Sequence, residues 1–232
     1  MKYSLRLFGT LTPTPVKIVI VEDQTMVRDL LVRACQATFA QATVEQAADG
    51  AQAFERCKAL PPDLILLDLE LPDGDGLDWL PKLHGVAPGA KVIILSSHTD
   101  DVTVHRVMQK HVEGFVDKNS QPMEMLREAV QTVMEGRRYL SPALREVWSR
   151  LRDEPEAFSK ILSDREQEIL RFVGRGLTNS EIAEVLGLRA VTVQNHRCNI
   201  MTRLGIHSTS HLIRYANDKG FTRLSGGIQE KH

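Results

Sequence analysis

Cysteine is scarce in this chain, which has only Cys35, Cys57 and Cys198 among its 232 residues. Three scattered thiols exclude a disulfide framework and a zinc site built from clustered cysteines, and they favour reduced thiols. No uncharged run of about 18 residues occurs, which excludes a membrane span. Arg6 interrupts the short apolar patch at the N-terminus, so we expect no signal peptide. The protein is therefore expected to be cytoplasmic, with no membrane contact.

Net charge is also small, at −1, but the two halves of the chain differ. Residues 16–135 contain 11 Lys and Arg against 19 Asp and Glu, a net of −8. Residues 160–223 contain 10 against 6, a net of +4. This asymmetry favours an acidic domain followed by a domain that binds a polyanion. The length and the hydrophobic content of 42% suit two domains, each with its own core.

Apolar runs alternate with helical patterns five times in the first half. This alternation predicts a doubly wound, flavodoxin-like α/β domain with a five-stranded parallel sheet and right-handed crossovers. We place the domain at residues 16–136, after a flexible leader at 1–15. The predicted strands lie at 16–21, 43–47, 64–67, 92–95 and 114–116.

Polar residues follow the ends of four of these strands. Glu22 and Asp23 follow the first strand, and Asp68 follows the buried run at 64–67. Ser96 and Lys118 follow the last two strands. The carboxyl ends of parallel strands lie at one edge of a sheet, where open α/β folds bind ligands. We therefore expect these five side chains to converge.

The acidic members of this predicted cluster favour a divalent cation. Three carboxylates in one pocket raise one another's pKa, and a bound Mg²⁺ ion would remove this conflict. Asp68 could then attack a phosphorus atom and form an aspartyl phosphate. Lys118 would offset charge on the phosphoryl group, and the Ser96 hydroxyl could donate a hydrogen bond to one of its oxygens. The residue types thus predict a site that accepts a phosphoryl group.

The second half of the chain is helical in pattern throughout. Residues 161–223 predict an all-α, four-helix helix-turn-helix domain, with a helical or mixed linker at 137–160 before it and a tail at 224–232 after it. Ser163 and Glu166 have the spacing of a capping box at the start of the first helix.

The predicted helix at 190–204 follows a turn at Gly187 and has apolar residues along its inner side. One α-helix fits the major groove of DNA, so the outer polar residues of this helix are candidates to face DNA. Gln and Asn can bond adenine edges, and Arg can bond guanine or phosphate. The candidates are Gln194, Asn195, Arg197 and Cys198.

Residues 16–136 resemble the receiver domain of two-component response regulators. The matching residues are Ile-Val-Glu-Asp at 20–23, Asp68 with Pro72 and Gly76, Leu-Ser at 95–96, and Lys118. The resemblance implies that Asp68 accepts the phosphoryl group, that Lys118 contacts it, and that Ser96 and Phe115 act as the switch. It also implies that Mg²⁺ is held by Glu22, Asp23, Asp68 and the backbone carbonyl of Glu70.

Residues 162–220 resemble the LuxR-type DNA-binding domain. The matching segments are Leu-Ser-Asp-Arg-Glu at 162–166, Gly-Leu-Thr-Asn-Ser-Glu-Ile-Ala at 176–183 and Val-Thr-Val-Gln-Asn-His at 191–196. The resemblance implies base contacts from Gln194, Asn195 and Cys198. It implies contacts to backbone phosphate from Thr178, Asn179 and Thr192.

Both resemblances together point to a response regulator of the NarL/FixJ class. Such a protein would accept a phosphoryl group from a sensor histidine kinase, form a homodimer when active, bind double-stranded DNA and control transcription, without being an enzyme. Two alternatives belong to other classes. One is a phosphorylation-controlled adaptor that acts through protein binding, and the other is a phosphatase-like enzyme that turns over small phosphoesters.

Overall fold

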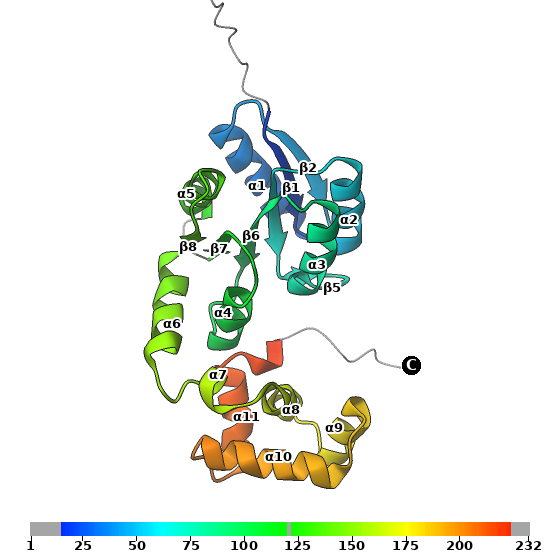
Figure 1. Cartoon of the computed structure of the whole chain (residues 1–232), viewed down its shortest axis with the longest axis vertical. Helices are drawn as coiled ribbons and strands as arrows, with labels where there is room; N and C mark the ends of the chain where they lie inside the picture. The colour runs from blue at the N-terminus through cyan, green and yellow to red at the C-terminus, as the bar shows by residue number, and fades with distance from the viewer. Residues whose placement is uncertain (1–14, 120–121, 224–232) are drawn as a thin grey trace, which may run out of the picture.

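The computed structural model describes residues 15–119 and 122–223. The 224–232 tail and all but the last residue of the 1–15 leader lie outside the described residues. The first domain is a twisted parallel sheet with helices on both faces (Figure 1), in the strand order β2-β1-β3-β6-β7-β8. Its strands are β1 Lys17–Val21, β2 Thr43–Ala47, β3 Leu64–Asp68, β6 Lys91–Ser96, β7 Gly114–Asp117 and β8 Tyr139–Leu140, and a separate hairpin pairs β4 Glu70–Leu71 with β5 Gly74–Asp75.

The doubly wound fold is confirmed, but the predicted strand number was wrong by one. In the described part of the chain the sheet has six strands, because β8 extends it beyond β7. This strand lies in the segment predicted as a linker, where Tyr139 is buried against the sheet. Two residues are too short to produce an alternating pattern, so periodicity could not reveal the strand.

Two apolar layers enclose the sheet. Helices α1 Thr25–Thr38 and α5 Pro122–Met134 cover one face, with Ile18 and Ile20 of β1 beneath them. Helices α2 Gly50–Ala59, α3 Gly76–Val86 and α4 Asp101–Met108 cover the other face. All five residues of β3 are buried, as expected for a central strand with helices on both sides. This strand therefore carries Asp68 to the edge of the sheet on a rigid support.

The second domain is a compact set of helices (Figure 1). The capping box at Ser163 and Glu166 is confirmed, and Gly187 ends a helix in the left-handed conformation at φ 63°. No helix among the described residues is long and apolar enough to cross a membrane. After β8 the helices are α6 Pro142–Asp153, α7 Phe158–Ile161, α8 Asp164–Gly174, α9 Asn179–Leu186, α10 Ala190–Arg203 and α11 Thr209–Asp218, followed by the 3-10 turn η1 Phe221–Arg223.

Candidate functional site

The predicted acidic residues meet at the carboxyl edge of the sheet. Glu22 and Asp23 follow β1, and Asp68 is the last residue of the neighbouring strand β3. Carboxylate oxygens of the three residues lie within 4.8 Å of one another. Glu22 and Asp68 are buried, whereas Asp23 is exposed at the rim. The pocket is therefore open to a ligand on the side of Asp23.

Lys118 closes the inner side of this pocket. It follows β7, and its Nζ lies 2.7 Å from Oδ2 of Asp68 and 2.8 Å from Oε2 of Glu22. Its backbone N–H donates to the carbonyl of Ser96 at the end of β6, which fixes the loop that carries it. The ammonium group of Lys118 thus contacts both buried carboxylates, although Glu22 lies 96 positions before it in the sequence.

Burial is the main cause of the pKa shifts of the two buried carboxylates. Burial and the neighbouring charge of Asp68 raise the pKa of Glu22, although Lys118 opposes this. Burial also raises the pKa of Asp68, against the attraction of Lys118. For Lys118, burial favours the neutral form, but Asp68 and Glu22 outweigh it and raise the pKa. A single ammonium does not fully compensate the buried carboxylates, so the chemistry of the pocket suits a hard divalent cation.

The second predicted site lies on the outer face of α10. Gln194, Asn195 and Cys198 are exposed there, while Val193 and Ile200 are buried against the other helices. Val191 is 55% exposed on the same face, three and seven residues before Gln194 and Cys198. Sequence reasoning missed Val191, although its helical spacing from the polar candidates was the available signal. An exposed helix face of this kind fits the major groove.

Comparison with known proteins identifies both halves of the chain. Residues 18–131 match the response regulator receiver domain, and residues 160–216 match the luxR family of bacterial regulatory proteins. The oxygen regulatory protein NreC of Staphylococcus aureus strain MRSA252 is 34% identical over 212 residues, which cover 88% of this chain and 97% of NreC. The chain belongs to the two-component response regulators of the NarL/FixJ class.

Solved structures have the fold of this response regulator. RcsB from Salmonella enterica serovar Typhimurium, bound to promoter P1flhDC in the presence of phosphomimetic BeF3−, has a TM-score of 0.63 at 20% identity, over 88% of this chain and 99% of RcsB. A LuxR-family response regulator from Aurantimonas sp. SI85-9A1 has a TM-score of 0.56 at 26% identity, over 61% of this chain and 100% of its own. By family, the chain is a phosphorylation-dependent, DNA-binding transcription regulator.

The Ser96 hydroxyl of the response regulator is engaged with its own loop. It donates to the carbonyl of His98 at 3.2 Å and accepts from the His98 N–H at 2.9 Å. The His98 side chain reaches across the pocket rim, where its Nε2 lies 3.0 Å from a carboxylate oxygen of Glu70. Sequence reasoning did not find this contact, because its two residues lie in different loops and neither follows a pattern.

Phe115 of the response regulator is a core residue of β7 with free volume beside it. Its side chain is buried in the apolar layer that also contains Val104 of α4. A cavity of about 190 Å³ adjoins it. The cavity is lined by Met108, Val112, Glu113, Gly114, Phe115, Arg138, Tyr139 and Leu140.

Several residues predicted to contact DNA also hold the helix-turn-helix together. The half-buried Arg197 donates to the side-chain oxygen of Asn179 at 2.7 Å and to the Thr209 hydroxyl at 3.4 Å, so it joins α10 to α9 and α11. Thr178 caps α9, and its hydroxyl donates to the Glu181 carboxylate at 2.7 Å. Arg197 therefore holds α10 against two neighbouring helices, whereas Thr178 stabilises the start of α9. Thr192 is half-buried in the first turn of that helix.

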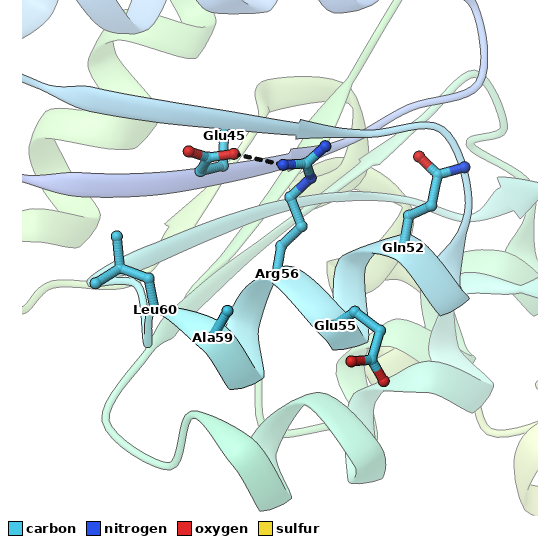
Figure 2. A pocket seen from close by; sticks show the side chains of 6 residues that line it. All are labelled: Glu45, Gln52, Glu55, Arg56, Ala59 and Leu60. Carbon is cyan, nitrogen blue, oxygen red and sulfur yellow. Dashed lines mark hydrogen bonds and ion pairs between the residues drawn. The ribbon is translucent and has the colours of Figure 1, made fainter.

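A hollow elsewhere on the receiver contains none of the predicted site residues. It has a volume of about 380 Å³ and lies between β2 and α2, with Glu45 and Arg56 forming an ion pair at 2.8 Å (Figure 2). Glu55 points away from this ion pair in Figure 2. Because its paired charges satisfy one another at the surface, the hollow offers no chemistry comparable to the acidic pocket.

Proposed function

We propose that the response regulator accepts a phosphoryl group on Asp68 from a sensor histidine kinase and that this event controls DNA binding through α10. The observation that carries the proposal is the contact of Asp68 with Lys118 at 2.7 Å beside the carboxylates of Glu22 and Asp23. The chain stores the phosphoryl group and acts through α10, so we assign it no enzymatic turnover of its own. Because its proposed target is DNA, we place it in the cytoplasm.

The transfer uses a carboxylate oxygen of Asp68 as nucleophile. This oxygen forms the new bond to phosphorus while the bond from phosphorus to the kinase histidine nitrogen breaks. The leaving nitrogen keeps the electron pair of that bond. Lys118 balances the charge that develops on the phosphoryl oxygens. Ser96 then exchanges its contacts with His98 for a phosphoryl oxygen, and Phe115 repacks into the adjacent cavity.

A magnesium ion fits the same pocket. Glu22, Asp23 and Asp68 would hold it through carboxylate oxygens, and the carbonyl of Glu70 would add a neutral oxygen ligand. When bound, the ion neutralises charge between the carboxylates and the incoming phosphoryl group. The raised pKa values of Glu22 and Asp68 support this assignment, because they report buried negative charge that Lys118 leaves uncompensated.

Mg²⁺ is expected to raise the thermal midpoint by about 5–11 °C at a concentration about a hundredfold above its dissociation constant, because binding to the folded chain stabilises it by about 2.7 kcal/mol. Asp23→Asn should remove most of this increase. Asp29→Asn, at an exposed carboxylate of α1, is the matched control and should retain it. Thermal unfolding with and without Mg²⁺ measures the effect. An equal increase in both variants would contradict the assignment of Asp23.

The same experiment has a defined pH dependence. Metal ligands must be deprotonated, and the folded pKa values of Glu22 and Asp68 lie above their ordinary values of 4.5 and 3.8. Protons therefore compete with Mg²⁺ as the pH falls through these raised pKa values. We expect the Mg²⁺-induced increase to decline, as the pH falls, at pH values above those at which ordinary carboxylates titrate.

For the DNA contact, we propose that Gln194, Asn195 and Cys198 face bases while Thr192 lies against backbone phosphate. Arg197 and Asn179 hold α10 against α9, and Thr178, Asn179 and Arg197 approach phosphate from the side of α10. Two copies of the chain would then read two related half-sites. The RcsB structure bound to promoter DNA supports a DNA-binding role for the C-terminal domain by likeness of fold.

Asn195→Ala is expected to weaken binding to a duplex selected from random DNA by about tenfold or more, because one amide contact to a base discriminates by about 1–3 kcal/mol. Gln131→Ala, which removes an exposed amide from α5, is the control and should bind normally. Fluorescence anisotropy at two salt concentrations gives the affinities and their salt dependence. If the wild-type protein selects no duplex even at low salt, the adaptor alternative replaces this proposal.

A further inference from the structure

Arg28 of α1 lies against the acidic loop, residues 22–24, which connects β1 to α1. Its Nη1 donates to the backbone carbonyl of Glu22 at 2.5 Å and to the backbone carbonyl of Asp23 at 3.3 Å. These two carbonyls belong to consecutive peptide groups, and both accept from the same nitrogen. Arg28 is half-buried, so these contacts are partly shielded from water. The guanidinium therefore holds the backbone of two residues that contribute carboxylates to the pocket.

Two further contacts anchor the guanidinium itself. Nε of Arg28 donates to the side-chain oxygen of Gln46 at 3.3 Å, and Nη2 donates to the hydroxyl of Thr25 at 3.4 Å. Gln46 lies on β2, which pairs with β1, and Thr25 is the first residue of α1. A guanidinium has five N–H donors in fixed directions within one plane, a geometry that a lysine ammonium does not reproduce. Arg28 therefore joins the acidic loop to the neighbouring strand and to the start of its own helix.

The two carbonyls that Arg28 contacts determine the direction of the Asp23 side chain. A peptide group is planar, and the Cα atom of Asp23 joins the peptide group that carries the Glu22 carbonyl to the one that carries its own. Holding both planes therefore restricts φ and ψ of Asp23, the only two soft dihedral angles of its backbone. The direction of its Cα–Cβ bond is restricted with them. Arg28 thus acts on the Asp23 carboxylate through the backbone.

Asp23 depends on this support more than the other two acidic residues of the pocket do. Glu22 and Asp68 are buried, and the ammonium of Lys118 contacts the carboxylate of each one directly. Asp23 is exposed at the rim, so neighbouring side chains restrain it least. Gln24, the N-cap residue of α1, makes no side-chain hydrogen bond to the helix end, so a local cap does not fix this turn. The contacts of Arg28 fix it from outside the turn.

We propose that Arg28 is a positioning residue for the divalent cation, because it holds the backbone of the acidic loop so that the Asp23 carboxylate stays beside those of Glu22 and Asp68. The inference rests on the Mg²⁺ site of the proposed function. Loss of a group that orients metal ligands typically lowers metal affinity by about 10–100-fold. Charge alone predicts the opposite sign, since removing a cation beside an acidic pocket strengthens the attraction for Mg²⁺. The direction of the change therefore separates positioning from electrostatics.

The affinity of the full chain for Mg²⁺ tests this inference. Titration with MgCl₂ at constant ionic strength, followed by the backbone amide resonances of the acidic loop, gives the dissociation constant. Arg28→Ala should weaken binding by about tenfold or more, and Arg28→Lys should recover only part of the loss, because an ammonium lacks the planar set of donors. Arg33→Ala, which removes an exposed arginine from the same helix, is the matched control and should bind like the wild type. Equal or tighter binding by Arg28→Ala would overturn the inference, whereas a wild-type chain that binds no Mg²⁺ would overturn the proposed metal site itself.

Hydrogen exchange without metal shows whether Arg28 holds the loop, and it separates this role from a general loss of stability. The backbone N–H of Glu22 donates to the carbonyl of Ala47 at 3.1 Å, and its exchange reports opening of the acidic loop. The amide of Leu66, in the buried strand β3, reports unfolding of the whole receiver. In Arg28→Ala, exchange at Glu22 should accelerate by about tenfold more than exchange at Leu66. Equal acceleration at the two amides would mean that Arg28 contributes only general stability, and the inference would be wrong.

Discussion

Asp68→Asn is expected to abolish the incorporation of a phosphoryl group from acetyl phosphate in the presence of Mg²⁺. An amide has no carboxylate oxygen to attack phosphorus, so the acyl phosphate cannot form. In intact-mass spectrometry, the wild-type chain should gain one phosphoryl mass and the variant should keep its original mass. Asp78→Asn is the matched control, because Asp78 is an exposed carboxylate in the first turn of α3 and should leave the gain intact.

The variant should fold, so that lost chemistry is not confused with lost structure. Burial raises the pKa of Asp68 in the folded chain, which means that its ionisation at neutral pH opposes folding. A neutral amide of the same shape removes this penalty and the repulsion from Glu22. We therefore expect a thermal midpoint, without divalent cations, equal to or above that of the wild type. A phosphoryl gain that persists in Asp68→Asn would point to a different acceptor.

The acidic pocket could be predicted from the sequence because each of its parts is a local signal. A buried run of apolar residues ends at Asp68, and β-branched residues precede Glu22 and Asp23. Once the alternation of strands and helices predicts a parallel sheet, topology places every strand end at one edge. The convergence of Glu22, Asp23, Asp68 and Lys118 therefore followed from the fold class, without knowledge of distances.

The contacts between the domains could not be predicted in this way. Lys219 and Asp101 are separated by 118 positions. Neither residue belongs to a periodic pattern from which its ion-pair partner could be predicted. The position of Val102 in the core of the second domain depends on how the domains pack, which no local propensity encodes. The interdomain junction is thus a property of tertiary packing alone.

Thr178 illustrates a signal that was present but assigned to another role. The family resemblance placed it against DNA phosphate, and the structure shows its hydroxyl bonded within a capping box to Glu181. The spacing of Thr178 and Glu181 is the same as that of Ser163 and Glu166, which was recognised as a cap. The same local spacing therefore indicates the cap at Thr178, while its contact with DNA phosphate stays a prediction.

Among glycine-to-alanine substitutions in the receiver, Gly76→Ala is expected to cause the largest loss of stability. A Cβ atom at this position would lie 2.1 Å from the backbone oxygen of Asp68 and 3.0 Å from its carbonyl carbon. Both atoms are backbone, so the strand end itself must move. We expect a loss of about 3 kcal/mol in the free energy of unfolding and a fall of about 6–12 °C in the thermal midpoint. Displacement of Asp68 should also slow phosphoryl incorporation.

Gly85→Ala, in the same helix, should have the opposite effect. Gly85 is exposed near the end of α3, and nothing lies within 4 Å of a Cβ atom there. Alanine favours helix over glycine by about 1 kcal/mol, so the midpoint should rise slightly and phosphoryl incorporation should not change. Thermal unfolding of both variants, followed by the intact-mass assay, separates the two effects. Equal thermal midpoints for Gly76→Ala and the wild type would mean that the end of β3 can shift at little cost in free energy. The backbone that carries Asp68 would then not be rigid.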